Sequence, residues 1–294
     1  MEGTLRVIGA ILVVATAISG ASGDGWLDDI REDVRDPGPD STPPPKKKKK
    51  KRHDDGSHFH FHFHDCDDDD DEDSGLYDIV GWFAAYCITS PIWGPHCAVG
   101  DDLSVEGFFP RFPYEGHWPG YMRIGVPSTA GRRFAGRFRV DYADNFDDLE
   151  RIGGHLLVST SSRLGLDTEL SRFEESLHGG AHDQLWLGDC NVVFRFAQSP
   201  RSQWRAGIGF NWLDDPIDTN FGFNFTYAFD FFPRRPWVLS TELDWGTLGE
   251  AELFHFRSTA GVVLWSLESY VGYEYWDIDR SQTSALVAGV QMWF

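Results

Sequence analysis

The chain has 294 residues, 15% of them aromatic, and a formal net charge of −20 at pH 7. Nucleic-acid binding needs clustered cations that neutralise phosphates. The one such cluster, Lys46–Arg52, is soon followed by the acidic run Asp67–Asp73, so nucleic acid is not expected as a partner. No apolar run reaches 18 residues, so the sequence predicts no membrane-spanning helix.

Residues 1–23 have the layout of a secretory signal peptide. Arg6 precedes the apolar stretch Val7–Ile18, and small residues follow up to Gly23. Twelve apolar residues are too few to cross a membrane. We therefore predict an exported protein that is cleaved near Ala21 or Gly23.

Residues 24–75 are predicted to be a low-complexity, disordered linker. The stretch contains Pro43–Pro45, the cationic block Lys46–Lys51 and the anionic block Asp67–Asp73. Segments with little apolar surface and blocks of like charge bury too little area to offset the chain entropy lost on folding.

Four histidines alternate with phenylalanines inside this linker. In an extended chain the imidazoles project to one side, and imidazole is a favoured ligand of Zn, Cu and Ni. One hypothesis is therefore a site for a divalent transition metal; the other, which we favour, is a low-complexity expansion that binds metal only incidentally, because no spaced Cys/His pair completes a tetrahedral set. The candidate ligands are His58, His60, His62 and His64.

Residues 76–127 form a short apolar segment rich in Pro and Gly, expected in the periplasm. Cys87 and Cys97 are ten residues apart, and an oxidising compartment would allow them to form a disulfide. Cys66 and Cys190 have no evident partner. The segment either plugs the mouth of the following domain or, as we favour, packs on its rim without blocking it.

Residues 128–294 contain about ten runs in which every second residue is apolar. Strand side chains alternate between two faces, so each run has one apolar and one polar face. Short connections, such as Ser161–Arg163 and Trp265–Ser266, alternate with mostly longer acidic ones, such as Asn145–Glu150. The clearest run is Phe221, Phe223, Phe225, Tyr227, Phe229 and Phe231.

The last run alternates up to a terminal phenylalanine, Phe294. This end resembles the terminal strand of bacterial outer-membrane β-barrels, which the barrel-assembly machinery recognises. The resemblance implies an all-β fold, an antiparallel up-and-down transmembrane barrel of about ten strands, in contact with outer-membrane lipid and with its N-terminal arm in the periplasm. Eight or twelve strands remain possible, and a soluble sandwich or lipocalin-like barrel is the alternative.

The polar faces of these runs carry charges of both signs. Small barrels fill their interiors with side chains, and buried charges must be paired. We therefore predict a salt-bridged lumen, not an open pore. Its residues are Arg137, Arg139, Asp141, Asp167, Glu169, Arg195, Arg205, Glu242, Asp244, His255, Arg257, Glu268 and Glu274.

The sequence favours a small closed barrel with a structural, binding or surface-interaction role and no cofactor. One alternative is a hydrolase of omptin-like architecture, with His178 and His182 beside Asp183, or with Asp214 and Asp215. Another is an envelope metal-binding protein that uses the histidine segment. No catalytic motif is present, so no catalytic residue is assigned and an enzyme is the less favoured class.

Overall fold

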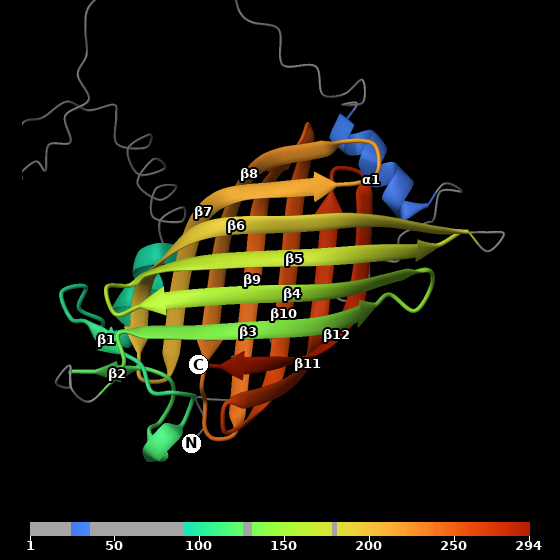
Figure 1. Ribbon diagram of the computed structural model, residues 1–294. Helices are drawn as coiled ribbons and strands as arrows, with labels where there is room; N and C mark the ends of the chain where they lie inside the picture. Colours follow the sequence, from blue (N-terminus) through green and yellow to red (C-terminus); the bar gives the residue numbers. More distant parts are fainter. Residues whose placement is uncertain (1–24, 36–90, 126–130, 178–180) are drawn as a thin grey trace, which may run out of the picture.

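The computed structural model describes residues 25–35, 91–125, 131–177 and 181–294 (Figure 1). The barrel strands are 11 to 18 residues long, which suits tilted strands that cross a bilayer. Their bounds are β3 Phe134–Asp144, β4 Leu149–Thr160, β5 Leu164–Ser176, β6 His182–Ser199, β7 Ser202–Asp214, β8 Thr219–Phe231, β9 Trp237–Leu248, β10 Ala251–Leu264, β11 Leu267–Ile278 and β12 Ser281–Trp293.

These ten strands form a closed barrel in which each strand pairs antiparallel with its neighbour in sequence. β12 pairs with β3 and closes the ring, with Val290 opposite Val140. The predicted antiparallel up-and-down barrel is therefore confirmed, as is the count of ten. Closure leaves no unpaired sheet edge.

The side chains on the two faces of the wall differ sharply. The outside is apolar, with Ile208 and Phe221 each 61% exposed, whereas lumen-facing Asn224 and Arg257 are 0% and 1% exposed. The alternation is interrupted in β6, where the register shifts between Phe194 and Ala197. This distribution is the inverse of a soluble sandwich, which buries its apolar face.

One part of the predicted linker is ordered. Residues 24–75 were expected to be disordered, but Trp26–Arg35 form helix α1. The reason is the spacing of Leu27, Ile30 and Val34, which places three apolar side chains on one face of a helix. This face enters the barrel end where β3 finishes, hereafter the α1 mouth, and packs on inward-facing residues: Leu149, Phe173, Leu185, Leu187, Leu213, Leu248, Leu253, Trp276 and Ile278.

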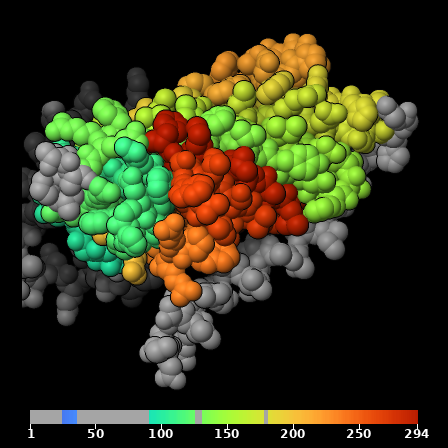
Figure 2. Space-filling model, turned by 60° about the horizontal axis from the view of Figure 1, so that its bottom comes forward, coloured from blue at the N-terminus to red at the C-terminus, as the bar shows by residue number. Residues whose placement is uncertain are grey.

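The opposite end, hereafter the C-terminal mouth, is covered by residues 101–124. A helix over residues 91–99 is followed by β1 (Gly107–Phe108) and β2 (Arg123–Ile124), which pair with each other. Figure 2 shows this teal-to-green segment packed against the barrel end. Its aromatic and apolar side chains bury against inward-facing barrel residues, which favours the plug over the rim arrangement; the cluster is Phe109, Tyr114, Tyr121, Met122, Ala135, Phe232, Val238, Val263 and Trp293.

Several sequence predictions fall outside the described residues. They are the signal peptide, the four histidines of residues 58–64, and Cys87, so that its pairing with Cys97 stays a prediction. Within the described ranges, no helix combines the length and apolarity needed to span a bilayer.

Candidate functional site

The lumen is the candidate functional site, because alternation along ten strands directs one polar side chain after another into it. Arg257 on β10 lies at its centre. Its guanidinium group donates to both oxygens of Glu169 on β5, at 2.6 and 2.8 Å, and to Glu274 on β11 at 3.1 Å. The contact with Glu169 joins β10 to β5, which are not neighbouring strands, so it crosses the lumen.

Two further arginines extend this network. Arg139 on β3 donates to Glu169 at 2.6 Å and lies 3.4 Å from Glu242 on β9. Arg151 on β4 donates to Asp141 at 2.8 Å and to Glu274 at 2.7 Å. Each carboxylate therefore accepts from an arginine of another strand, which satisfies the pairing requirement of buried charges.

A second group lies closer to the C-terminal mouth. Asp230 on β8 accepts from Arg137 at 2.8 Å and from Ser240 at 2.7 Å, and it also pairs with Arg205. Arg205 lies 3.5 Å from Asp167, which links this group to the central network. The lumen is thus filled across its middle by side chains that are all nearly fully buried.

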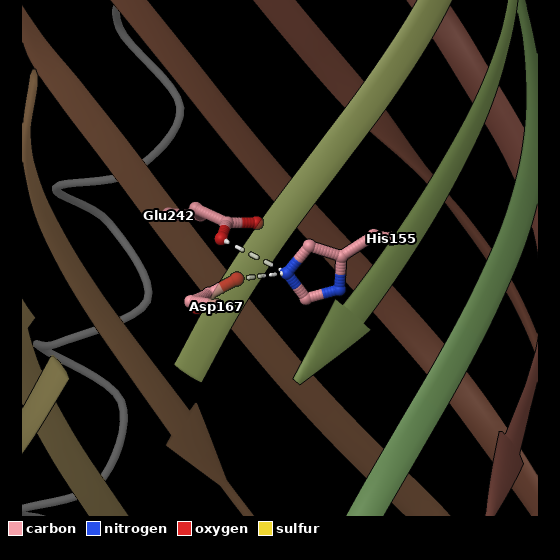
Figure 3. A group of neighbouring side chains, drawn as sticks. All are labelled: His155, Asp167 and Glu242. Atoms are coloured by element: carbon pink, nitrogen blue, oxygen red, sulfur yellow. Dashed lines mark hydrogen bonds and ion pairs between the residues drawn. The ribbon is translucent and has the colours of Figure 1, made fainter. Parts of the chain in front are cut away.

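His155, Asp167 and Glu242 form the one group of potential metal ligands found among the described residues (Figure 3). The Nε2 atom of His155 contacts Asp167 Oδ1 and lies 3.7 Å from Glu242 Oε1. Both carboxylates already face guanidinium groups, Asp167 that of Arg205 and Glu242 that of Arg139. A divalent cation would add charge beside these arginines, so the surroundings fit an imidazole that bridges two carboxylates better than a metal centre.

A small cavity lies between this network and α1. His255 stacks on Trp276 with ring centroids 3.7 Å apart, and its Nδ1 is 3.0 Å from Asp244. These three residues line the cavity together with Asp189 and Asn211. The cavity is lined by residues of strands β5, β6, β7, β9, β10 and β11.

Two predicted network residues make other contacts. Arg195 donates to the Gln198 side chain at 2.9 Å and lies over the ring of Phe109, so it holds the mouth segment. It forms no ion pair with a carboxylate in the part of the chain that the structure describes. Glu268 accepts from Gln291 at 3.1 Å and from the indole of Trp293 at 2.9 Å. The remaining predicted residues lie in the lumen as described above.

Sequence reasoning missed Arg151 and His155. Gly153 and Gly154 lie between them and obscured the strand, which the structure places at Leu149–Thr160. The available signal was the two-residue spacing from Arg151 through Gly153 to His155 and Leu157, which gives these residues one shared face. Gly153 is required there, because a Cβ atom would lie 2.1 Å from the Arg151 guanidinium.

Helix α1 is held at its mouth by charges as well as by apolar contact. Glu175 of β5 accepts from the backbone amides of Trp26 (2.6 Å) and Leu27 (3.0 Å), and so caps the helix N-terminus. Near the other end, Asp33 accepts from the Arg280 side chain at 2.8 Å. The amide of Glu250 donates to the Val34 carbonyl at 3.1 Å.

Two of the acidic residues considered for a hydrolase, Asp183 and Asp215, bind the arginines of α1 instead, and Asp214 accepts from the Thr219 hydroxyl. Asp215 accepts from Arg31 at 2.8 Å and from Arg35 at 2.7 Å, and Arg31 also pairs with Asp183. Burial alone would raise the pKa of Asp215, but the hydrogen bond from Arg35 and those from nearby backbone amides outweigh it and lower the pKa to about 2. His182 lies 3.7 Å from Glu174, and His178 is outside the described residues.

Comparison with known proteins gives only distant likeness. No protein-family model matches the chain, and no curated protein matches it. The β domain of the Bordetella autotransporter BrkA is 12% identical, with a TM-score of 0.32 over 55% of this chain and 98% of that one. For the N-terminal barrel of Pseudomonas aeruginosa OprF the values are 11%, 0.26, 54% and 97%, and for the KdgM porin 11%, 0.24, 54% and 98%. The fold assignment rests on the strand pairing of this chain itself.

Proposed function

We propose that this chain is an outer-membrane β-barrel with a closed lumen and a structural or surface-binding role. The inverse distribution of side chains supports a lipid environment, because a wall of exposed Phe, Trp, Leu and Val would aggregate in water. The exported context predicted from residues 1–23 and the resemblance of the terminal strand, which ends at Phe294, support the outer membrane and recognition by the assembly machinery.

One observation carries the closed state: ion pairs cross the lumen between strands that are not neighbours. Arg257 joins β10 to β5, and Arg137 joins β3 to β8. Opening a water-filled path would separate several such pairs at once and would leave buried charges without partners. These ion pairs lie further inside the barrel than α1, so the closure does not depend on the helix.

The test is conductance in planar bilayers, made with the full chain and with a variant that lacks residues 25–35. We expect heat-modifiable migration in gels for both proteins, which reports a closed barrel, and no stable single-channel steps from either. Stable ion-selective steps from a correctly folded barrel would show that the protein is a pore. Migration that does not change on boiling would argue against the membrane barrel itself.

A further inference from the structure

The C-terminal mouth carries a set of exposed arginines that have no charged partner. They come from three connections that are separate in sequence: the approach to β3, the β6–β7 turn and the β8–β9 connection. All are exposed, and none forms an ion pair with any described residue. This arginine rim consists of Arg132, Arg133, Arg201, Arg234 and Arg235.

Aromatic side chains mark the depth of this rim. Phe134 follows Arg133 directly and is 64% exposed on the outer wall, and Trp237 follows Arg235 by two residues and is 48% exposed. Trp265, in the neighbouring β10–β11 turn, is also exposed. Aromatic girdles lie at the boundary between hydrocarbon and head groups, so arginines just beyond them lie at the level of the lipid phosphates.

The opposite end of the barrel has the opposite charge, so the arginine rim is not a consequence of composition. At the α1 mouth the exposed arginine is Arg280, which pairs with Asp33. The loops there expose carboxylates: Asp147, Asp148, Glu150, Asp214, Asp218, Glu250, Glu252 and Asp279. Among the residues that the structure describes, the exposed arginines without an ion pair are therefore gathered at one rim, although the net charge of the chain is −20.

We propose that the arginine rim binds the phosphate head groups of anionic phospholipids in the leaflet beside the C-terminal mouth. Guanidinium groups bind phosphate in a bidentate manner, and their attraction to an anionic leaflet adds up over several residues. The turns at this mouth are two to five residues long, which keeps the arginines close to the bilayer surface. The inference rests on the proposed membrane barrel and names its lipid partner.

The experiment compares the full chain in nanodiscs of phosphatidylcholine with nanodiscs that also contain phosphatidylglycerol. One variant replaces all five rim arginines with Gln. A matched control removes five charges at the other mouth: Asp147→Asn, Asp148→Asn, Glu150→Gln, Asp214→Asn and Asp218→Asn. The midpoint of heat modification is measured for each, at low and high salt.

We expect phosphatidylglycerol to raise the midpoint of the wild-type protein and of the control by about 5 °C, and salt to abolish the rise. The arginine variant should fold and show no rise. An equal rise in that variant, or none in a folded wild-type barrel, would overturn the proposal. Stronger stabilisation by lipopolysaccharide than by phosphatidylglycerol would overturn it too, whereas failure to insert into any nanodisc would contradict the proposed function instead.

Discussion

Arg257 shows how single side chains determine the state of the lumen. It contacts Glu169 and Glu274, and all three are nearly fully buried. An ion pair of this kind contributes modestly relative to a well-packed apolar pair, but removal of one partner leaves charge buried without compensation. Removal of one lumen arginine therefore destabilises the barrel more than removal of an arginine from a surface salt bridge would.

We expect Arg257→Met to lower the free energy of unfolding by about 3–5 kcal/mol, because Glu169 and Glu274 lose a shared partner. Arg172→Met, which removes a half-exposed pair with Glu174, should cost at most about 1 kcal/mol. Denaturant unfolding of the refolded barrel in lipid vesicles measures both. Equal losses would contradict the arrangement of the lumen described above.

Phe223 is 53% exposed on the outer wall, so its environment tests the lipid contact directly. Phe223→Arg should cost about 2–4 kcal/mol near the bilayer midplane, and Phe223→Leu much less. The neighbouring Asn224 is not a suitable control, because it is fully buried and its side chain donates to Asn191. Vesicle unfolding that does not distinguish the two Phe223 variants would speak against a lipid-facing position.

Metal binding by the four histidines of residues 58–64 stays a prediction. A peptide spanning Arg52–Asp73 should bind Cu or Ni on the order of micromolar and Zn more weakly, because the chain must order itself on binding. Binding should be lost as the pH falls through about 6.5, since protons compete for imidazole. Calorimetry measures it, with the four-Gln peptide as control; no heat with any of these metals would leave the segment inert.

At the scale of elements, α1 is docked by an apolar face and by charges at both ends. The strands alternate with period two, but α1 has the helical period, and its partners come from seven barrel strands. The position of Asp215, in the β7–β8 connection, matters most for pH, because it accepts from two arginines of the helix. Docking is therefore linked to the protonation of Asp215, and also to that of Asp183, whose pKa is lowered by its hydrogen bond with Arg31.

The pKa of Asp215 is lowered from 3.8 to about 2, in part by the hydrogen bond from Arg35 of α1. The part of its contribution that comes from docking is therefore present above pH 4 and is lost as the pH falls towards 2. A fluorescent dye is attached to Glu32→Cys in a protein whose four native cysteines are replaced by Ser. The fluorescence anisotropy of the dye should stay constant from pH 8 to 5 and should decrease below pH 4. Asp215→Asn should weaken docking at neutral pH and remove most of this dependence. An unchanged profile in Asp215→Asn would exclude this residue as the cause.

At the scale of the whole molecule, the two docked segments lie at opposite mouths. α1 closes one and residues 101–124 the other, so residues 36–90 connect two sides of one barrel. At about 3.3 Å per residue a chain of that length reaches roughly 180 Å, enough to pass around a detergent micelle. In a continuous bilayer the chain cannot pass around the barrel, and the ion pairs that cross the lumen prevent it from passing through the barrel.

We therefore expect α1 to dock in detergent-refolded protein but not in the same unbroken chain inserted in a bilayer. Val34→Cys with Glu250→Cys, in the background without native cysteines, should form a disulfide in micelles and not in vesicles. The contact between Asp101 and Arg163 at the C-terminal mouth, 2.6 Å, serves as control: cysteines at these positions should be linked in both. A disulfide between positions 34 and 250 that forms in vesicles would show that the connecting chain crosses the lumen during assembly.

The sequence by itself determined the barrel wall, because period-two alternation is a local property of the strand backbone. Phe221 and Phe223 face outward and Asn224 inward for that reason alone, and the turns at Ser161–Arg163 and Trp265–Ser266 lie where they were predicted. The charges of the lumen follow from the same alternation. Inward residues were missed where Gly153 and Gly154 removed the pattern, and Asp230 was left out of the predicted lumen residues although the alternation of β8 places it inward.

The tertiary structure decided which charges meet and what covers the two mouths. That Arg257 meets Glu169, 88 residues away, depends on strand register and on closure of the ring, which no local pattern encodes. Docking of α1 and the arginine rim arise in the same way, since they join residues from connections far apart in sequence. Local backbone geometry determines the face of each side chain, whereas its partner across the barrel is determined only when all ten strands are in place.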